Sequence, residues 1–248
     1  MISYILRYCF QEDRGFRAGA ARNMGIKLAD SNICIFIDNG IILHSKAIEN
    51  HISIHNNETE PCLIIGYVYG MLEEERTDEI LDALKVNSPD EAIRILNATG
   101  IIDCRDLYYR EFGNDLQKWP APYFVCWTCN ISARRDMILE SGLFDERFTS
   151  WGIEDIDFGI MQYKNNVKFV LARDASSIHF PHGKTYTSDS AKLLEKVAYL
   201  NRIDYLYKKH PIRAMELWAA TKSDNPLYYV NKILLEEDGL CLHPTSVM

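Results

Sequence analysis

Acidic side chains follow a tryptophan–glycine pair in the second half of the chain. Trp151 and Gly152 precede Glu154, Asp155 and Asp157. On a helix, residues 154 and 157 share one face, whereas residue 155 points elsewhere. A first helical turn favours carboxylates, which explains some of these acids but leaves the bulky turn before them unexplained. An indole beside two carboxylates suits a sugar ring, because such a ring has an apolar face and hydroxyl groups.

Two further polar positions follow strand-like segments. The apolar run 33–37 predicts a fully buried strand that ends in a turn beginning at Asp38. In an open α/β sheet, side chains just beyond the carboxyl ends of strands face the ligand crevice, and Asp38 has that position. The alternative for Asp38 is an Asx turn. His179 and His182 follow another strand-like segment, and each is either a metal ligand or a surface histidine.

The elements that must position these side chains alternate between helix and strand. This alternation predicts an α/β core at residues 1–188, a helical insertion at 71–120 and a helical extension at 189–248. In the insertion, Ser88-Pro89 predicts a helix start, and Pro211 and Pro226 each open a new helix in the extension. Helices are predicted over 15–30, from Ser45 to 56, from Ser132 to Gly142 and over 154–165, with strands over 33–37, 62–69, 123–131, 168–171 and 176–180.

Length and composition limit the class of protein. The chain has 248 residues, 47% of them hydrophobic and 25% charged, which excludes a disordered or fibrous protein. No apolar run approaches the ~20 residues that span a bilayer, so we expect no transmembrane segment. A net charge of −8 without a basic block argues against nucleic acid or an anionic membrane as partner. Seven scattered cysteines indicate a reduced compartment, and we predict a cytoplasmic protein.

Three parts of the chain, in this order, carry a family resemblance. They are GFRAGAARNMG at 15–25, FIDNG at 36–40, and a third series of NISARR at 130–135, GLFDERF at 142–148 and WGIEDIDFG at 151–159. Together they resemble glycosyltransferases of the GT-A fold, in the broad family 2 group, with a galactosyltransferase-type carboxy-terminal half. The resemblance covers residues 11 to about 183 without the insertion. It implies a Rossmann-like mixed sheet flanked by helices.

The resemblance also implies catalytic roles. Asp155 would be the general base that takes the proton from the acceptor hydroxyl, and Glu154 would orient that hydroxyl. Trp151 would pack on a sugar, with Gly152 beside it in the substrate-binding turn. Direct displacement by an acceptor activated in this way inverts the anomeric configuration. The reaction implied is transfer of a hexose from a nucleotide-diphosphate sugar to a hydroxyl-bearing acceptor.

Other residues take binding roles from the same resemblance. Trp127 and Asn130 would line the sugar pocket, although Trp127 is equally suited to the core. Asp38 would contact the nucleotide ribose or its metal ion, with His179 contributing to the metal from the far side. Arg22 would face the diphosphate; the alternative is a surface arginine paired with Asp13 or Asp30.

Two departures from the family pattern leave alternatives open. Asn39 and Gly40 stand where carboxylates are usual, and both are poor ligands for Mg²⁺ or Mn²⁺. Dependence on a divalent cation and independence of one are therefore equally expected. Only 14 residues precede Gly15, so we expect a GT-A domain that is shortened at its amino terminus. The chain is then a fragment, or a partner supplies the missing strands, or donor binding is lost. An open strand edge predicts a homo-oligomer or a partner chain.

Two rival functions follow from these departures. The first is a non-catalytic glycosyltransferase-like subunit or carbohydrate-binding partner that needs another chain to bind the donor. The second is a metal-dependent hydrolase built from Asp38, Glu154, Asp155 and His179.

Smaller motifs have plainer interpretations. In a strand, Cys126 and Cys129 would lie on opposite faces, so we predict buried thiols rather than a disulfide or a shared metal. Asp103, Arg105 and Asp106 either contact an acceptor or form a solvated charged face.

Overall fold

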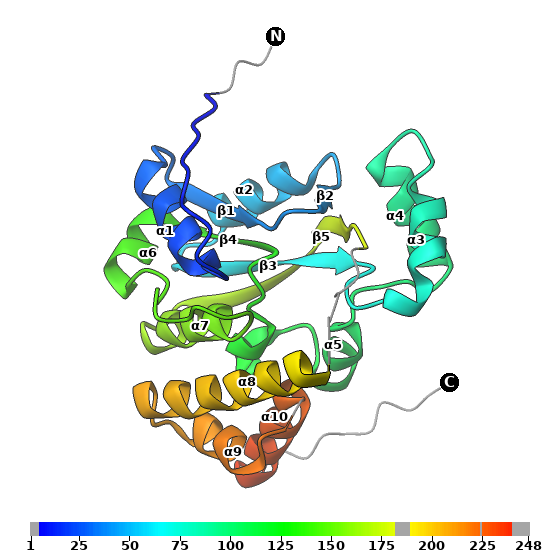
Figure 1. Ribbon diagram of the computed structural model, residues 1–248. Helices are drawn as coiled ribbons and strands as arrows, with labels where there is room; N and C mark the ends of the chain where they lie inside the picture. Colours follow the sequence, from blue (N-terminus) through cyan, green and yellow to red (C-terminus); the bar gives the residue numbers. More distant parts are fainter. Residues whose placement is uncertain (1–4, 182–188, 224, 240–248) are drawn as a thin grey trace.

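A computed structural model describes residues 5–181, 189–223 and 225–239. In that part of the chain, a five-stranded sheet lies at the centre with helices on both faces (Figure 1). The strand order is β1-β4-β3-β5-β2; β3 and β5 pair in parallel, and the other neighbours are antiparallel. The predicted α/β class with a mixed sheet is confirmed. The strands are β1 (Ile33–Ile37), β2 (Ile41–Leu43), β3 (Cys62–Tyr69), β4 (Asn130–Arg134) and β5 (Lys168–His179).

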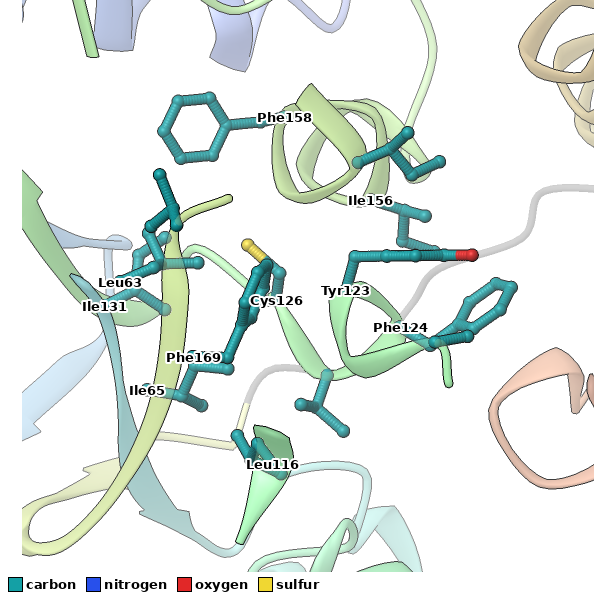
Figure 2. Packing of buried hydrophobic residues seen from close by; sticks show 14 of the residues in the cluster. Leu63, Ile65, Leu116, Tyr123, Phe124, Cys126, Ile131, Ile156, Phe158 and Phe169 are labelled. Atoms are coloured by element: carbon teal, nitrogen blue, oxygen red, sulfur yellow. The ribbon is translucent and has the colours of Figure 1, made fainter. Parts of the chain in front are cut away.

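The central strand β3 divides the core, because successive side chains of a strand point to opposite faces. Leu63 and Ile65 belong to the main core together with Phe158, as Figure 2 shows. Cys62 and Ile64 lie in a smaller apolar cluster that packs against the helix on the other face. All four β3 side chains are fully buried, as the continuous apolar run predicts.

Helices cover the sheet in three groups. Helix α2 packs on one face against β3 and β5, and α7 lies on the other face near α6 (Figure 1). Helices α3 to α5 belong to the insertion, and α8 to α10 form the extension below the sheet in this view. The helices are α1 (Ala18–Leu28), α2 (Ala47–Asn57), α3 (Thr77–Ala83), α4 (Pro89–Ala98), α5 (Asp106–Phe112), α6 (Arg135–Ser141), α7 (Glu154–Lys164), α8 (Asp189–Lys209), α9 (Arg213–Thr221) and α10 (Pro226–Glu237).

The extension shares the main apolar core with the sheet. Trp218 of α9 is buried and its ring lies 5.3 Å from that of Phe124, so it anchors the extension to the core. Pro211 lies between α8 and α9, and the new helix begins two residues later at Arg213, whereas Pro226 occupies the first turn of α10 as predicted. The boundary at residue 188 stays a prediction. His182 and the rest of 182–188 lie outside the described residues.

The predicted strand over 123–131 is wrong. Pro122–Val125 forms a short 3-10 helix, and β4 begins only at Asn130. A continuous apolar run indicates burial without distinguishing strand from other buried backbone, and Pro122 favours a helix start. Helix α7 approaches this segment so closely that a Cβ at Gly159 would lie 2.9 Å from that of Cys126. Cys126 is buried with a free thiol, as predicted, although not in a strand.

Two predicted helix caps are also wrong, and one is confirmed. Ser132 lies inside β4, and Ser45 precedes the α2 cap and donates its hydroxyl to Asp90 at 2.6 Å. Ser88 does cap α4, accepting a hydrogen bond from the backbone N–H of Glu91 at 3.2 Å. Serine favours turns as well as caps, and tertiary partners decided which role the first two took.

The predicted strands at 33–37 and 168–180 differ from the structure in detail. Strand β1 is an edge strand of the described sheet, so its burial alternates instead of being complete. The two predicted strands 168–171 and 176–180 are one strand, β5. A partner chain along the sheet edge stays a prediction. None of the helices within the described residues is long and apolar enough to cross a membrane.

Candidate active site

The predicted site residues converge on one cavity of about 860 Å³. Its wall includes the carboxylates of Asp38, Glu154 and Asp155 and the indole of Trp151. The acids after the tryptophan and the acid after β1 therefore face a common cavity, although they lie more than a hundred residues apart. Of the other predicted residues, the cavity is lined by Arg22, Trp127, Gly152 and His179, with Asn39 beside them.

The pairing of β2 with β5 brings the turn after Asp38 next to the end of β5, where His179 lies. Strand β2 pairs with β5 so that Ile41 lies opposite His179. The turn that follows Asp38 places Gly40 at φ +86°, and the Gly40 carbonyl accepts from the N–H of Phe180 at 2.8 Å. A left-handed φ suits glycine because it has no Cβ. This turn explains why glycine stands at residue 40, where the family resemblance would favour a carboxylate.

A strained turn presents Trp151 and the acidic pair. Gly152 and Ile153 both have left-handed backbone, with φ of +88° and +79°, immediately before α7 begins. A β-branched residue rarely adopts this conformation, and such strain is often retained at functional sites. Trp151 remains 52% exposed at the cavity, whereas Ile153 is buried and anchors the turn. Helix α7 consequently starts with Glu154 and Asp155 at the cavity wall.

Arg22 connects three elements at the site. Its Nη1 donates to Glu154 Oε1 at 3.0 Å, and its Nη2 donates to Asp38 Oδ1 at 2.9 Å. The guanidinium also lies 5.4 Å from the centre of the Phe144 ring. The pairing with Asp13 or Asp30 is wrong, because the guanidinium points into the cavity instead. We call Arg22, Asp38, Glu154 and Asp155 the Arg22 cluster.

The Arg22 cluster holds an incompletely paired carboxylate. Glu154 is 3% exposed, and its Oε2 is buried without a hydrogen-bond partner among the described residues. Burial, and then the charge of Glu154, raise the pKa of the neighbouring Asp155 from 3.8 to about 8, although Arg22 lowers it. Asp155 Oδ1 accepts from the N–H of Ile156 at 2.8 Å. The arrangement disfavours the charged form of Asp155, so its carboxylate is an unusually strong proton acceptor.

The third acid of the turn has a different role. Asp157 is fully buried on α7, where Lys209 Nζ and His210 Nε2 each contact it at 2.8 Å. The sequence grouped Asp157 with Glu154 on one helix face. The structure shows that Asp157 attaches the extension to the core, while Glu154 lines the cavity. Only the tail histidine next to a proline hinted at this contact.

Asn130 is not a cavity residue, which corrects the prediction. It is fully buried and donates to the Ala175 carbonyl at 2.9 Å, and His51 Nε2 contacts its Oδ1 at 2.9 Å. Ser132 Oγ lies 2.8 Å from His51 Nδ1 and 2.9 Å from His55 Nε2. We call His51, His55, Asn130 and Ser132 the His51 cluster. It joins α2 to β4 inside the core and serves the fold.

Asp103, Arg105 and Asp106 do not form a solvated charged face, because all three are buried, and none of them lines the cavity. Asp103 and Arg105 are completely buried, and Arg105 Nη2 donates to Asp103 Oδ2 at 2.6 Å. Arg105 also donates to the carbonyls of Gly66 and Val125. Its guanidinium lies 5.2 Å from the Trp127 ring, so it supports the indole that lines the cavity. Burial requires such pairing, because a lone charge in the core is costly.

Part of the cavity wall was not predicted. Met71, Leu72, Tyr108, Phe124 and Leu227 line it, and we call them the apolar wall. Three of them come from the insertion and one from the extension. Apolar residues in helix-rich segments resemble ordinary core residues in sequence, so no local signal marked them.

The residues near Asp38 do not form a complete metal cage. Among the described residues, no three His, Cys, Asp or Glu side chains converge as metal ligands. Asp38 and His179 both line the cavity and offer one carboxylate and one imidazole. Magnesium is commonly held by one or two carboxylates together with substrate phosphates. The donor set therefore fits an ion that is completed by a phosphate-bearing substrate.

Known proteins similar to this chain are named as enzymes of sugar transfer. No protein-family model matches the chain. It is 29% identical over 218 residues to validoxylamine A glucosyltransferase of Streptomyces hygroscopicus subsp. jinggangensis (strain 5008), covering 87% of this chain and 50% of that protein. It is 25% identical over a 249-residue alignment to the uncharacterized glycosyltransferase YfnE of Bacillus subtilis (strain 168), covering 91% of this chain and 62% of that protein. It is 28% identical over 222 residues to hyaluronan synthase of Pasteurella multocida, covering 82% of this chain and 22% of that protein.

The chain thus spans about half the length of the first of these relatives. The resemblance to glycosyltransferases is confirmed at the level of the class. The galactosyltransferase-type half and the GT-A assignment stay predictions. By sequence, this chain is a relative of glycosyltransferases.

Proposed function

We propose that this chain carries a GT-A glycosyltransferase site that transfers a hexose from a nucleotide-diphosphate sugar to a hydroxyl acceptor. The observation that carries the proposal is the cavity in which Asp155, with its raised pKa, lies beside Glu154 and Trp151. The names of the relatives favour catalysis over a non-catalytic subunit.

In this proposal Asp155 is the general base. The acceptor hydroxyl gives its proton to the Asp155 carboxylate while its oxygen attacks the anomeric carbon of the donor. The bond from that carbon to the diphosphate oxygen breaks, and the nucleoside diphosphate leaves with the electron pair. A single displacement inverts the configuration. A base with a pKa near the working pH performs such a transfer well.

Glu154 and Arg22 would position the reacting groups. The Oε2 of Glu154 is buried without a hydrogen-bond partner among the described residues, and in this proposal it would accept a hydrogen bond from an acceptor hydroxyl. Arg22 holds the other oxygen and Asp38, and its positive charge would face the diphosphate. Trp151 and Trp127 would pack on sugar rings, and Gly152 lets the Trp151 turn form.

We further propose that Asp38 and His179 hold a divalent cation, Mg²⁺ or Mn²⁺, when a donor is present. The ion would neutralise negative charge on the leaving diphosphate. Binding of Mn²⁺ alone, followed by electron paramagnetic resonance with and without UDP, tests this. We expect tight binding only with UDP, and Asp38→Asn should abolish it.

The proposed reaction is tested with UDP-, GDP- and dTDP-hexoses, each with and without Mn²⁺. Calorimetry measures donor binding, and release of the nucleoside diphosphate measures turnover. For the donor that reacts, we expect Asp155→Asn to lower the rate by ~10²–10⁴-fold, as loss of a positioned base does. Donor affinity should stay within a few-fold of wild type.

Asp136→Asn is the matched control. Asp136 is also the second residue of its helix, and its Oδ1 accepts from the next N–H, that of Met137, at 2.8 Å. It lies on α6, away from the cavity lining. A rate for Asp155→Asn within a few-fold of that for Asp136→Asn would refute the assignment of the base.

A further inference from the structure

The cavity has an apolar wall that the chemistry of sugar transfer does not use. Met71, Leu72, Tyr108, Phe124 and Leu227 line the same cavity as Asp155. Phe124 and Leu227 are buried in the main core, so this wall is anchored. Trp127 Nε1 donates to the Phe124 carbonyl at 2.9 Å, which joins the wall to the indole at the site. A ligand at Asp155 therefore has apolar surface within the same enclosure.

A hydrogen bond between two distant segments fixes the shape of this wall. Tyr108 of α5 donates its hydroxyl to Asn225 Oδ1 at 3.1 Å. The same oxygen accepts from the N–H of Tyr228 at 3.3 Å and caps α10. The insertion and the extension are thereby held together beside the cavity (Figure 1). Pre-formed walls of this kind are typical of binding sites for small molecules.

Leu72 supplies an independent observation. It is 58% exposed at the cavity, and its backbone is left-handed, with φ of +61°. Leucine in this conformation costs free energy that asparagine or glycine would largely avoid. Neither local backbone preference nor core burial accounts for a leucine here. Strain combined with exposure of an apolar side chain at a cavity indicates contact with a ligand.

Charge at the cavity limits which ligands suit this wall. Glu73 and Glu74 also line the cavity, and they add to the carboxylates of the Arg22 cluster. A negatively charged group next to them would be repelled. The charge at the cavity therefore argues against an anionic group at the wall, and the apolar side chains there favour an apolar one.

We propose, on the basis of the proposed function, that the apolar wall is an acceptor subsite for an uncharged aromatic or aliphatic ring. The ring is attached close to the hydroxyl that accepts the hexose. It lies against Leu72 and Leu227 while that hydroxyl reaches Asp155. Burying a ring of this size against apolar side chains strengthens binding by about tenfold or more.

The test compares the binding of phenyl, methyl and 4-carboxyphenyl β-D-glucopyranosides, and of the matching galactosides. Trp127 and Trp151 line the cavity, so tryptophan fluorescence and calorimetry report binding directly. In the wild type, we expect at least one phenyl glycoside to bind about tenfold more tightly than its methyl counterpart. The carboxyphenyl compound should lose most of that advantage.

Leu72→Asn tests the wall without disturbing the fold, because asparagine tolerates the left-handed backbone. It should reduce the preference for phenyl over methyl to about threefold or less. Leu107→Asn is the matched control: Leu107 is 56% exposed, also belongs to the insertion and does not line the cavity. The preference of Leu107→Asn for the phenyl over the methyl glycoside should equal that of wild type. A wild-type preference below twofold for both sugars, or a full preference in Leu72→Asn, overturns the proposal.

The outcomes also separate the subsite from the proposed function. Hexose transfer without any phenyl preference would overturn the subsite alone. A phenyl preference that depends on Leu72, in a protein that turns over none of the donors, would overturn the proposed function and the acceptor role.

Discussion

Two polar clusters in this molecule differ in how completely their buried groups are paired. In the His51 cluster, the side chains of His51, Asn130 and Ser132 meet partners at 2.8–2.9 Å within the core. In the Arg22 cluster, one oxygen of Glu154 has no hydrogen-bond partner among the described residues. No member of the His51 cluster lines the cavity, whereas all four members of the Arg22 cluster do.

The difference separates structural polar groups from reactive ones. A buried polar network is stable when each member is satisfied, and it then adds specificity to the fold. An unsatisfied carboxylate is costly, so its presence at a cavity indicates a place for a ligand. The members of the His51 cluster are all buried in the core, whereas the Arg22 cluster is charged and reaches the cavity, where the Asp38 side chain is 45% exposed.

Arg22→Gln should produce the largest difference between the clusters. Arg22 lowers the pKa of Asp155, so its loss raises that pKa further above 8. The acidic limb of the pH–rate profile should move up by about one unit, and the rate at pH 7 should fall roughly 10–100-fold. Arg22→Lys should restore part of both, because it keeps the charge. If the acidic limb of the pH–rate profile lies at the same pH in Arg22→Gln and in wild type, the guanidinium does not shift the pKa of Asp155.

Ser132→Ala should act on stability alone. It removes the hydroxyl that His51 and His55 contact, and a buried unpaired group costs about 1–3 kcal/mol. Urea unfolding should show this loss, while donor affinity and the pH–rate profile remain unchanged. Ser53→Ala on α2, the helix that carries His51 and His55, is the control, since Ser53 is exposed and should change stability by less than about 0.5 kcal/mol. An altered donor affinity in Ser132→Ala would contradict the purely structural role of the His51 cluster.

The two clusters should respond oppositely to pH. The folded-state pKa of Asp155 is raised from 3.8 to about 8, so the stability it contributes is lost as pH rises through that window. Burial lowers the pKa of His55 from 6.5 to about 4, so its contribution is lost as pH falls through that window.

Thermal melts of wild type and Asp155→Asn from pH 4 to 9.5 test this contrast. The Tm of Asp155→Asn minus the Tm of wild type should increase as pH rises, by about 3 °C or more above pH 8. A constant difference would contradict the raised pKa. From pH 6.5 toward 4 the variant should lose stability because of His55, whereas in wild type the stability that Asp155 regains as pH falls should oppose that loss.

Gly152→Ala should have the smallest effect. Its φ of +88° is unfavourable for alanine, although a Cβ there would meet no atom within 4 Å. We expect a loss of about 1 kcal/mol in unfolding free energy. Gly25→Ala is the control: it is helical, its Cβ also meets no atom, and alanine there should stabilise by about 0.5–1 kcal/mol. Equal effects of the two substitutions would remove the evidence for strain at the Trp151 turn.

Local patterns were sufficient for most elements and for part of the site. The apolar run 62–69 predicted β3, and Ser88-Pro89 predicted the start of α4, because period and caps are properties of neighbouring residues. Apolarity predicted burial of 123–131 but not its backbone, which close packing against Gly159 determined. Asn130 carried a family motif, yet its neighbours in space made it a core residue.

The sequence by itself determined which side chains follow the strands and begin the helices, including Asp38 after β1 and Asp155 in the first turn of α7. These positions depend on short-range periodicity and turn chemistry. Only the tertiary structure decided that Arg22 joins Asp38 to Glu154, and that the insertion and extension complete the cavity at Tyr108 and Asn225. Such contacts connect residues as much as 132 positions apart, and their free energy comes from burial and pairing that no local window contains.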